Sequence, residues 1–171
     1  MNCPQRTQGG SGNDRHHNPP PSIRLDDIRF SKGVDTNLFD KIAQRVARDI
    51  AEDGHWSKKK EGWKREKNLS KNKSAQLRKF YDELVMWHDK VFEHGVDRAA
   101  KYNELAPFIK MLCAKVTYAK GREHVGEGFE RLFTHVIRAI SDPETLKQAK
   151  LFIEAFTGFY KAEEKNHAET Q

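Results

Sequence analysis

The reactive side chains of this sequence do not form a recognisable catalytic or metal-binding motif. Cys113 lies within an apolar helical pattern, where a small buried side chain is expected in preference to a nucleophile. His124 and His135 are eleven residues apart, about three helical turns, and the eight histidines include no HExxH pair. The glycine-rich stretch 121–128 follows a predicted helix and lacks Gly-Lys-Ser/Thr, so it is not a phosphate-binding P-loop. We expect no catalytic residue, no metal site and no cofactor.

A strongly basic stretch is the more informative feature. Residues 55–73 contain eight Lys and Arg against two Glu, and 8 minus 2 gives +6, equal to the formal net charge of the whole chain. Trp56 and Trp63 are interleaved with the cations, which suits a nucleic acid strand that needs both phosphate partners and stacking surfaces. A solvated linker is the alternative. The lysines that we select here as candidate RNA-binding residues are Lys58, Lys59, Lys60, Lys64 and Lys73.

Apolar spacing around this stretch predicts helices and no convincing strand. Helical periodicity covers about 37–52, 74–95, a piece at 97–105, 107–119, 125–140 and 142–160, with Pro107 separating the third and fourth of these segments. Asp35 or Thr36 is expected to cap the first helix, and Asp142-Pro143 to begin the last. The fold class is therefore all-α, a compact bundle of about five helices. Residues 1–36 are expected to form a disordered or extended tail, 37–162 the bundle with a basic loop at 55–73, and 163–171 a polar tail.

Four further cations fall on the predicted helices. Lys115 and Arg122 lie seven and fourteen residues after Phe108, which places them on the predicted apolar side of that helix, about 10.5 Å apart along its axis. Such cations either pair with a carboxylate from another helix or extend to the rim and meet an external anion. Arg78 sits at the edge of the preceding helix's apolar face with Lys79 behind it, and either extends this surface or pairs with Asp82.

Composition limits the class of protein. Hydrophobic residues make up 36% of the chain, and no run approaches 18 consecutive apolar residues. The first 22 residues lack the apolar stretch of a signal peptide. We expect a cytoplasmic protein that does not enter a membrane.

Two segments carry a resemblance to a known family. They are 74–81 (SAQLRKFY) and 112–122 (LCAKVTYAKGR), followed by the Phe-rich last helix ending in FTGFYK at 156–161. These segments resemble the paired motifs of the small subunit of the type III-A CRISPR-Cas effector, the Csm complex. The resemblance extends over roughly 37–162.

The resemblance implies a non-catalytic helical subunit, present in several copies that stack into the inner filament of a ribonucleoprotein for antiviral defence. Its implied partners are guide RNA and target RNA, other copies of itself, the backbone subunits that cut the target, and the large polymerase-like subunit. Arg78, Lys115 and Arg122 are then the positions placed against the RNA backbone, with Lys79 beside them. The lysine run is longer and more basic than the family pattern.

Other classes of function compete with this interpretation. A helical DNA-binding regulator could place a short turn between the last two helices, although the cations are not gathered on the last helix as a recognition helix requires. A protein-binding adaptor, or an enzyme that uses Cys113, are the remaining alternatives.

Overall fold

The computed structural model describes residues 23–169 except 32, 54–55, 60–61 and 66–70, and it describes no side chains for 54–70 and 167–169. The described part is dominated by helices, as the apolar spacing predicts. A short 3-10 helix (Thr36–Phe39) is followed by α1 (Lys41–Asp53), β1 (Trp56–Lys59), β2 (Gly62–Arg65), α2 (Ser74–Val91), α3 (Arg98–Lys110), α4 (Leu112–Gly121), α5 (Glu127–Ala139) and α6 (Pro143–Glu169). The all-α prediction is confirmed.

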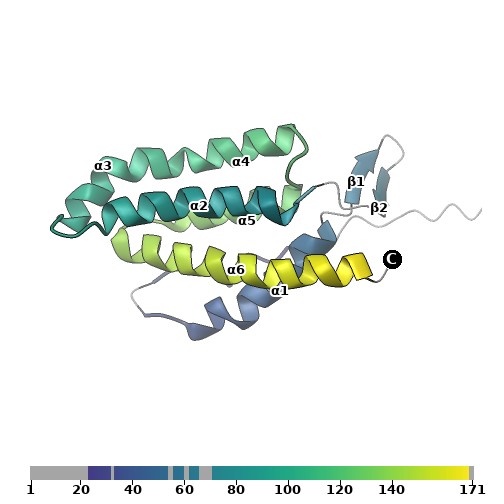
Figure 1. Ribbon diagram of the computed structural model, residues 1–171, viewed down its shortest axis with the longest axis horizontal. Helices are drawn as coiled ribbons and strands as arrows, with labels where there is room; N and C mark the ends of the chain where they lie inside the picture. Colours follow the sequence, from purple (N-terminus) through teal and green to yellow (C-terminus); the bar gives the residue numbers. More distant parts are fainter. Residues whose placement is uncertain (1–22, 32, 54–55, 60–61, 66–70, 170–171) are drawn as a thin grey trace, which may run out of the picture.

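The helices form one bundle in which α6 is the longest member (Figure 1). It packs against α1 and α2, while α5 packs against α4 and α1, and α2 also contacts α3. In Figure 1 the first turn of α2, the end of α4 and the two strands all lie at the same end of the molecule. This convergence places the two strands of the basic stretch at the same end as two helix termini.

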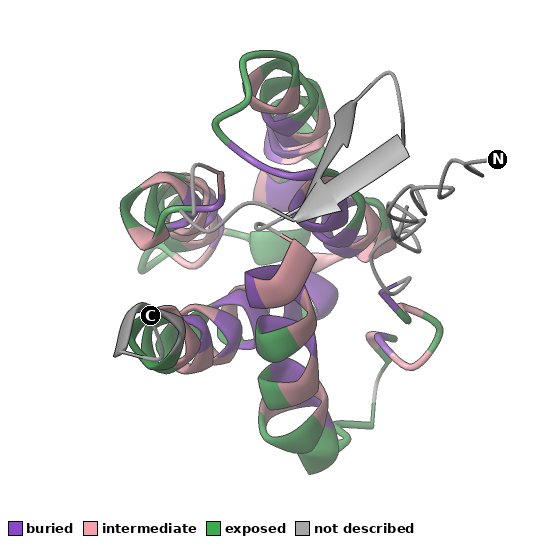
Figure 2. Cartoon of the chain, turned by 90° about the vertical axis from the view of Figure 1, so that its right-hand side faces the viewer, coloured by how far each residue is buried: buried purple, intermediate pink, exposed green. Residues whose placement is uncertain are grey.

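The core is built from the apolar stripes that the sequence predicts on the last two helices. Six residues of the 125–140 pattern are buried: Val125, Phe129, Leu132, Phe133, Val136 and Ile140. On α6, Phe152, Phe156 and Tyr160 are fully buried, with the Phe156 and Tyr160 rings 5.7 Å apart. Figure 2, seen from the strand end, shows the buried parts of the helices facing one another. Burial of several aromatic rings of roughly 150–250 Å² each supplies a large share of the hydrophobic stabilisation.

The predicted break at Pro107 is wrong. Pro107 lies inside α3, and the chain stays helical through Met111, whose N–H donates to the Pro107 carbonyl at 3.0 Å. Lys115 continues the pattern by donating to the Met111 carbonyl at 3.2 Å. Proline removes one helical hydrogen bond, but Asn103 and Pro107 are both exposed, so water can satisfy the freed carbonyl. Helices α3 and α4 therefore form one nearly continuous rod.

Hydrogen bonds to side chains fix the starts of α6 and α2, the first from a local residue and the second from a distant one. Asp142 caps α6, as predicted, by accepting from the Thr145 N–H at 2.8 Å. Lys73, at the N-cap position of α2, makes no capping bond with its side chain, and Glu164 instead accepts from the Ser74 N–H at 3.0 Å. The hydrogen bonds from Ser74 and Lys161 outweigh burial and lower the pKa of Glu164. α6 continues to Glu169, beyond residue 162, where the sequence analysis ended the bundle, and Glu164 links this extension to the start of α2.

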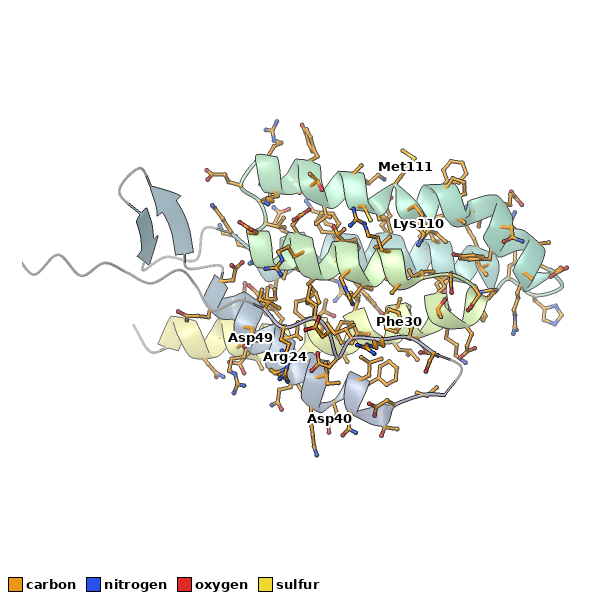
Figure 3. All side chains as sticks on the ribbon, turned by 180° about the vertical axis from the view of Figure 1, so that it is seen from behind. Arg24, Phe30, Asp40, Asp49, Lys110 and Met111 are labelled. Carbon is orange, nitrogen blue, oxygen red and sulfur yellow. The ribbon has the colours of Figure 1, made fainter. Side chains whose placement is uncertain are left out.

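Figure 3 shows the bundle from behind, with Lys110 and Met111 labelled on neighbouring positions of the α3–α4 rod. The Lys110 ammonium donates to the Ile137 and Ile140 carbonyls at the end of α5, at 2.8 and 2.6 Å. Burial lowers the pKa of Lys110. Met111, by contrast, is 55% exposed. The rod therefore has one side bound to α5 and another side open to solvent.

The segment before the 3-10 helix is packed onto the bundle from residue 23 onward. Ile23 and Ile28 are buried, and Arg45 of α1 holds the segment by donating to the Asp27 carboxylate at 2.8 Å and to the Arg24 carbonyl at 3.2 Å. Arg24 and Asp49, the second carboxylate partner of Arg45, are labelled in Figure 3. The tail expected at 1–36 is therefore packed against the bundle where it is described, and its residues 1–22 and 32 lie outside the described residues.

Two short strands interrupt the expected basic loop at 55–73. β1 and β2 pair antiparallel, with Trp56 opposite Arg65 and Lys58 opposite Trp63. Sequence reasoning missed them because they are only four residues long and lack an apolar alternation.

Candidate nucleic-acid interface

A buried asparagine joins the ends of the helices that carry the candidate cations. Asn72 is fully buried, has a φ of 58°, and directly precedes the α2 cap. Its N–H donates to the His124 carbonyl at 3.1 Å, and its side-chain oxygen accepts from the Gly126 N–H at 2.7 Å. Its carbonyl accepts from the Tyr160 hydroxyl at 2.5 Å. The start of α2 is thus fixed to the loop that follows α4, because each of these polar groups is satisfied only in this arrangement.

The cations of α2 lie on its exposed surface near this junction. Arg78 and Lys79 are both exposed, one turn into the helix. The Arg78 side chain is 73% exposed and pairs with Asp82 at 3.6 Å, which is the local pairing that the sequence analysis held open. An exposed pair at this spacing contributes only a few tenths of a kcal/mol. Arg78 can therefore exchange Asp82 for a phosphate at little cost.

The side of the helix at 107–119 that the sequence analysis predicted to be buried is not the side that the structure buries. The buried residues of the α3–α4 rod are Tyr102, Leu105, Ile109, Leu112 and Val116. Phe108, Met111, Lys115, Tyr118 and Arg122 form a separate line at spacings of three and four, and all five are exposed. The error came from starting a new helix at Pro107, which hid the continuous phase that begins at Tyr102. Lys115 and Arg122 consequently lie on the outer line of the rod and not on its buried side.

Each cation of the outer line has an intramolecular partner. Lys115 pairs with Glu83 of α2, which is the first of the two alternatives left open by the sequence, although half of the Lys115 side chain remains exposed. The Arg122 guanidinium lies 5.9 Å from the centroid of the Tyr118 ring and donates to its hydroxyl at 3.3 Å. Lys79 lies four residues before Glu83 on the same face of α2. It is therefore one helical turn away from the ion pair between Glu83 and Lys115. Together Lys79, Lys115 and Arg122 form what we term the α2–α4 cationic surface, while Arg78 lies about 100° around α2 from Lys79, on the flank nearer α6.

The basic stretch adjoins this surface but is only partly described. Lys73 is exposed at the cap of α2. Lys58 and Lys59 belong to β1 and Lys64 to β2, while Lys60 and the side chains of all four lie outside the described residues. Lys71 pairs with Glu123 at 3.2 Å, which again ties the stretch to the loop after α4.

Cys113 and His135 take up structural positions. Cys113 is half-buried against the core, and burial raises the pKa of its thiol, away from an activated thiolate. The His135 ring makes a hydrogen bond with the Ile28 carbonyl at 2.9 Å, and His124 is exposed on the loop after α4. Within the described ranges, no three His, Cys, Asp or Glu residues gather where they could hold a metal ion.

Two residues of the interface escaped the sequence analysis. Glu83 was not selected because its partner lies 32 positions away, beyond any local pattern. Tyr118 was read only as part of a motif, although its spacing of three from Lys115 and four from Arg122 places it on their line. If the helix is treated as continuous from residue 98 onward, its periodicity places Tyr118 on the exposed line with Lys115 and Arg122.

Comparison with known families identifies the chain. The family model described as Csm2 Type III-A matches residues 56–166, more than half of the chain and including both strands, α2, α4 and most of α6. The chain belongs to the Csm2 type III-A family. Its members are small subunits of the type III-A Csm complex, and the resemblance drawn from segments 74–81 and 112–122 is thereby confirmed. No curated protein and no solved structure matches the chain.

The Csm2 chain shows, over its described helices, none that is both long and apolar enough to cross a membrane.

Proposed function

We propose that this Csm2 chain is a non-catalytic subunit that binds the backbone of guide RNA and target RNA regardless of their sequence. We also propose that it forms the inner protein filament of the type III-A complex in antiviral defence. Its membership of the family supports the assignment to the complex. The observation that carries the RNA-binding part is the α2–α4 cationic surface, which the Asn72 junction fixes beside the basic stretch.

The chemistry of this surface suits a subunit that must accept any guide. Its side chains are Lys and Arg, which recognise phosphates, and the grooves of an RNA duplex present phosphates and 2′-hydroxyls more readily than base edges. Arg78 and Lys115 are paired only with partly exposed carboxylates, which phosphates can displace. Binding should therefore depend on salt and be independent of sequence.

The remaining parts of the proposal follow from the family assignment. The partners are other copies of the chain, the backbone subunits that cut target RNA, and the large polymerase-like subunit, all in the cytoplasm. The half-buried thiol of Cys113, with its raised pKa, agrees with a non-catalytic role.

Co-purification tests the assignment to the complex. The tagged full-length chain is expressed in its native cell and isolated under mild conditions. We expect a large particle containing several proteins and short RNAs of uniform 5′ sequence. A chain that elutes alone, or with DNA of one sequence, contradicts the proposal.

Direct binding tests the surface. Lys115→Ala and Arg122→Ala should weaken binding to unrelated RNA sequences by the same factor, and each should lower the slope of log K against log salt by about 0.7 to 0.9. Lys147→Ala is the matched control, because Lys147 is an exposed helical lysine near the start of α6, at the other end of the molecule (Figure 1). Equal loss in all three variants would show a diffuse charge effect and would contradict a defined surface.

The alternative, a helical DNA-binding regulator, has less support from the structure. A recognition helix after the turn between α5 and α6 would be α6 itself. That helix is packed against α1 and α2 and buries Phe152, Phe156 and Tyr160. Binding to one defined DNA duplex, measured by footprinting, would revive this alternative.

A further inference from the structure

Tyr118 is the most exposed of the large hydrophobic side chains in the described part of the chain, at 67%. It lies on the outer line of the α3–α4 rod, between Lys115 and Arg122. Helical geometry places it about 4.5 Å along the axis from Lys115 and about 6 Å from Arg122. An exposed ring is thus flanked on both sides by cations.

The surroundings of this ring keep it accessible. Helical side chains generally lean toward the preceding turn, which for Tyr118 contains Ala114 and Lys115. Ala114 is small and exposed, and Gly121, one turn after Tyr118, has no side chain, with no atom within 4 Å of where a Cβ would lie. Neither residue can cover the ring.

Arg122 restricts the orientation of the ring. Its guanidinium is 5.9 Å from the ring centroid, and it donates to the Tyr118 hydroxyl at 3.3 Å. A tyrosine that is held at its hydroxyl loses less rotamer entropy when a ligand packs on it. The cation also adds a second planar group beside the ring, and both groups stack on nucleobases.

We propose that Tyr118, held by Arg122 and flanked by Lys115, is a stacking surface for a single unpaired RNA base. This inference rests on the proposed RNA-binding function and names the part of the RNA that α4 recognises. Bases within a duplex are already stacked on their neighbours, so only an unpaired base can reach the ring. The phosphates on either side of that base then meet Lys115 and Arg122. Stacking is independent of base identity, because every base has a π-face.

Three RNA probes of equal length test the proposal with the full-length chain. The first is a perfect duplex, the second carries one bulged 2-aminopurine, and the third carries an abasic residue at the same position. We expect the wild type to prefer the bulged probe over the abasic probe by roughly tenfold, as for a single stacked base. Quenching of the 2-aminopurine fluorescence should accompany binding.

Variants separate stacking from charge. Tyr118→Leu should lose the preference and the quenching, whereas Tyr118→Phe, which keeps the ring but not the hydroxyl that Arg122 holds, should keep the quenching and a smaller preference. Phe108→Leu is the matched control, because Phe108 is another exposed ring on the same line that stacks instead on Trp87 at 5.5 Å. Circular dichroism checks that every variant keeps its helical content.

The outcomes distinguish the two proposals. If Lys115→Ala weakens binding to all three probes while Tyr118→Leu behaves as the wild type, RNA binding stands and the stacking surface is wrong. An equal loss of preference in Phe108→Leu and Tyr118→Leu also overturns it. If the wild type binds none of the probes, the proposed function itself fails, and the stacking surface fails with it.

Discussion

Lys115 of α4 forms an ion pair with Glu83 of α2, and this pair joins two helices that are separated by α3 in the sequence. The Lys115 side chain is 51% exposed and that of Glu83 is 26% exposed. A pair this close to solvent contributes little to stability, with a typical value below about 1 kcal/mol. Glu83 therefore adds little to stability, and we predict that it competes with an external anion for Lys115.

Glu83→Gln should strengthen RNA binding. The substitution frees Lys115 and removes a negative charge from the α2–α4 cationic surface, so we expect affinity to rise about two- to fivefold at low ionic strength and to converge on the wild-type value at high salt. Fluorescence anisotropy over a salt series measures the change. The double variant Glu83→Gln, Lys115→Ala should show no such gain over Lys115→Ala, and a full gain there would refute the competition.

Replacing Asn72 should destabilise the junction between α1, α2, α5 and α6. Asn72→Ala leaves the Gly126 N–H without its partner and places alanine at a φ of 58°, so we expect a loss of about 3 kcal/mol in the free energy of unfolding. Asn72→Gly tolerates this φ and should lose about 1 kcal/mol less. Urea denaturation measures both. Equal losses would show that the backbone conformation contributes nothing.

Tyr160→Phe isolates one bond of this junction. The Tyr160 hydroxyl donates to the Asn72 carbonyl at 2.5 Å, and phenylalanine preserves the packing of the ring. We expect a loss of about 1 to 2 kcal/mol in the free energy of unfolding, measured by urea denaturation. A variant as stable as the wild type would mean that water replaces the hydroxyl.

Asp53 should make stability depend on pH in an unusual direction. Burial raises the pKa of this carboxyl, although it accepts from the Gly128 N–H at 2.9 Å, and nearby Glu127 adds to the shift. Because the pKa is higher in the folded state than in the unfolded state, the charged form destabilises the fold. The protonated carboxyl therefore contributes stability to the folded state. This contribution is fully present at pH values below the ordinary pKa of 3.8, and it is lost as the pH rises through the raised pKa.

Asp53→Asn removes this dependence because an amide does not titrate, and its oxygen can still accept from the Gly128 N–H. The stability advantage of the variant should grow as the pH rises through the same window and then stay constant up to pH 7. Urea denaturation of both proteins over this range measures the difference. A variant that becomes relatively less stable as the pH rises would show that Lys71 and Arg131 dominate the environment of Asp53.

Two helical glycines should respond in opposite ways to alanine. A Cβ at Gly128 would lie 2.2 Å from the Ile23 Cδ1 and 2.7 Å from the Asp53 Oδ2, so Gly128→Ala should cost about 1 to 3 kcal/mol. Gly158 of α6 is exposed with no atom within 4 Å of such a Cβ, and Gly158→Ala should gain up to about 1 kcal/mol from helix propensity. Thermal denaturation compares them. A gain at both positions would show that Ile23 moves aside without cost.

Helix content was predictable because it depends on local spacing. The apolar positions of α5 and α6 recur at three and four residues, and Phe129, Phe133, Phe152 and Phe156 are all buried as predicted. Asp142 caps α6 for an equally local reason, since its partner Thr145 is three residues away. Such features need no knowledge of the rest of the chain.

The environment of the cations was not predictable in the same way. Pro107 suggested a new helix, and this assumption rotated the predicted apolar side of 107–119 onto residues that are in fact exposed, including Met111 and Lys115. The helical phase of α4 is set from Tyr102 onward by packing against neighbouring helices. A proline in the sequence does not by itself show that the carbonyl of Asn103, which loses its helical hydrogen bond, faces water.

The sequence by itself determined the all-α class, most helix positions, the concentration of positive charge at 55–73 and the family, because these depend on composition, periodicity and short motifs. Only the tertiary structure decided that Glu83 meets Lys115 and that Asn72 joins the start of α2 to the loop after α4. These contacts span 32 and 52 positions. They arise from the packing of whole helices, which fixes distant polar groups within hydrogen-bond reach and leaves Tyr118 exposed between two cations.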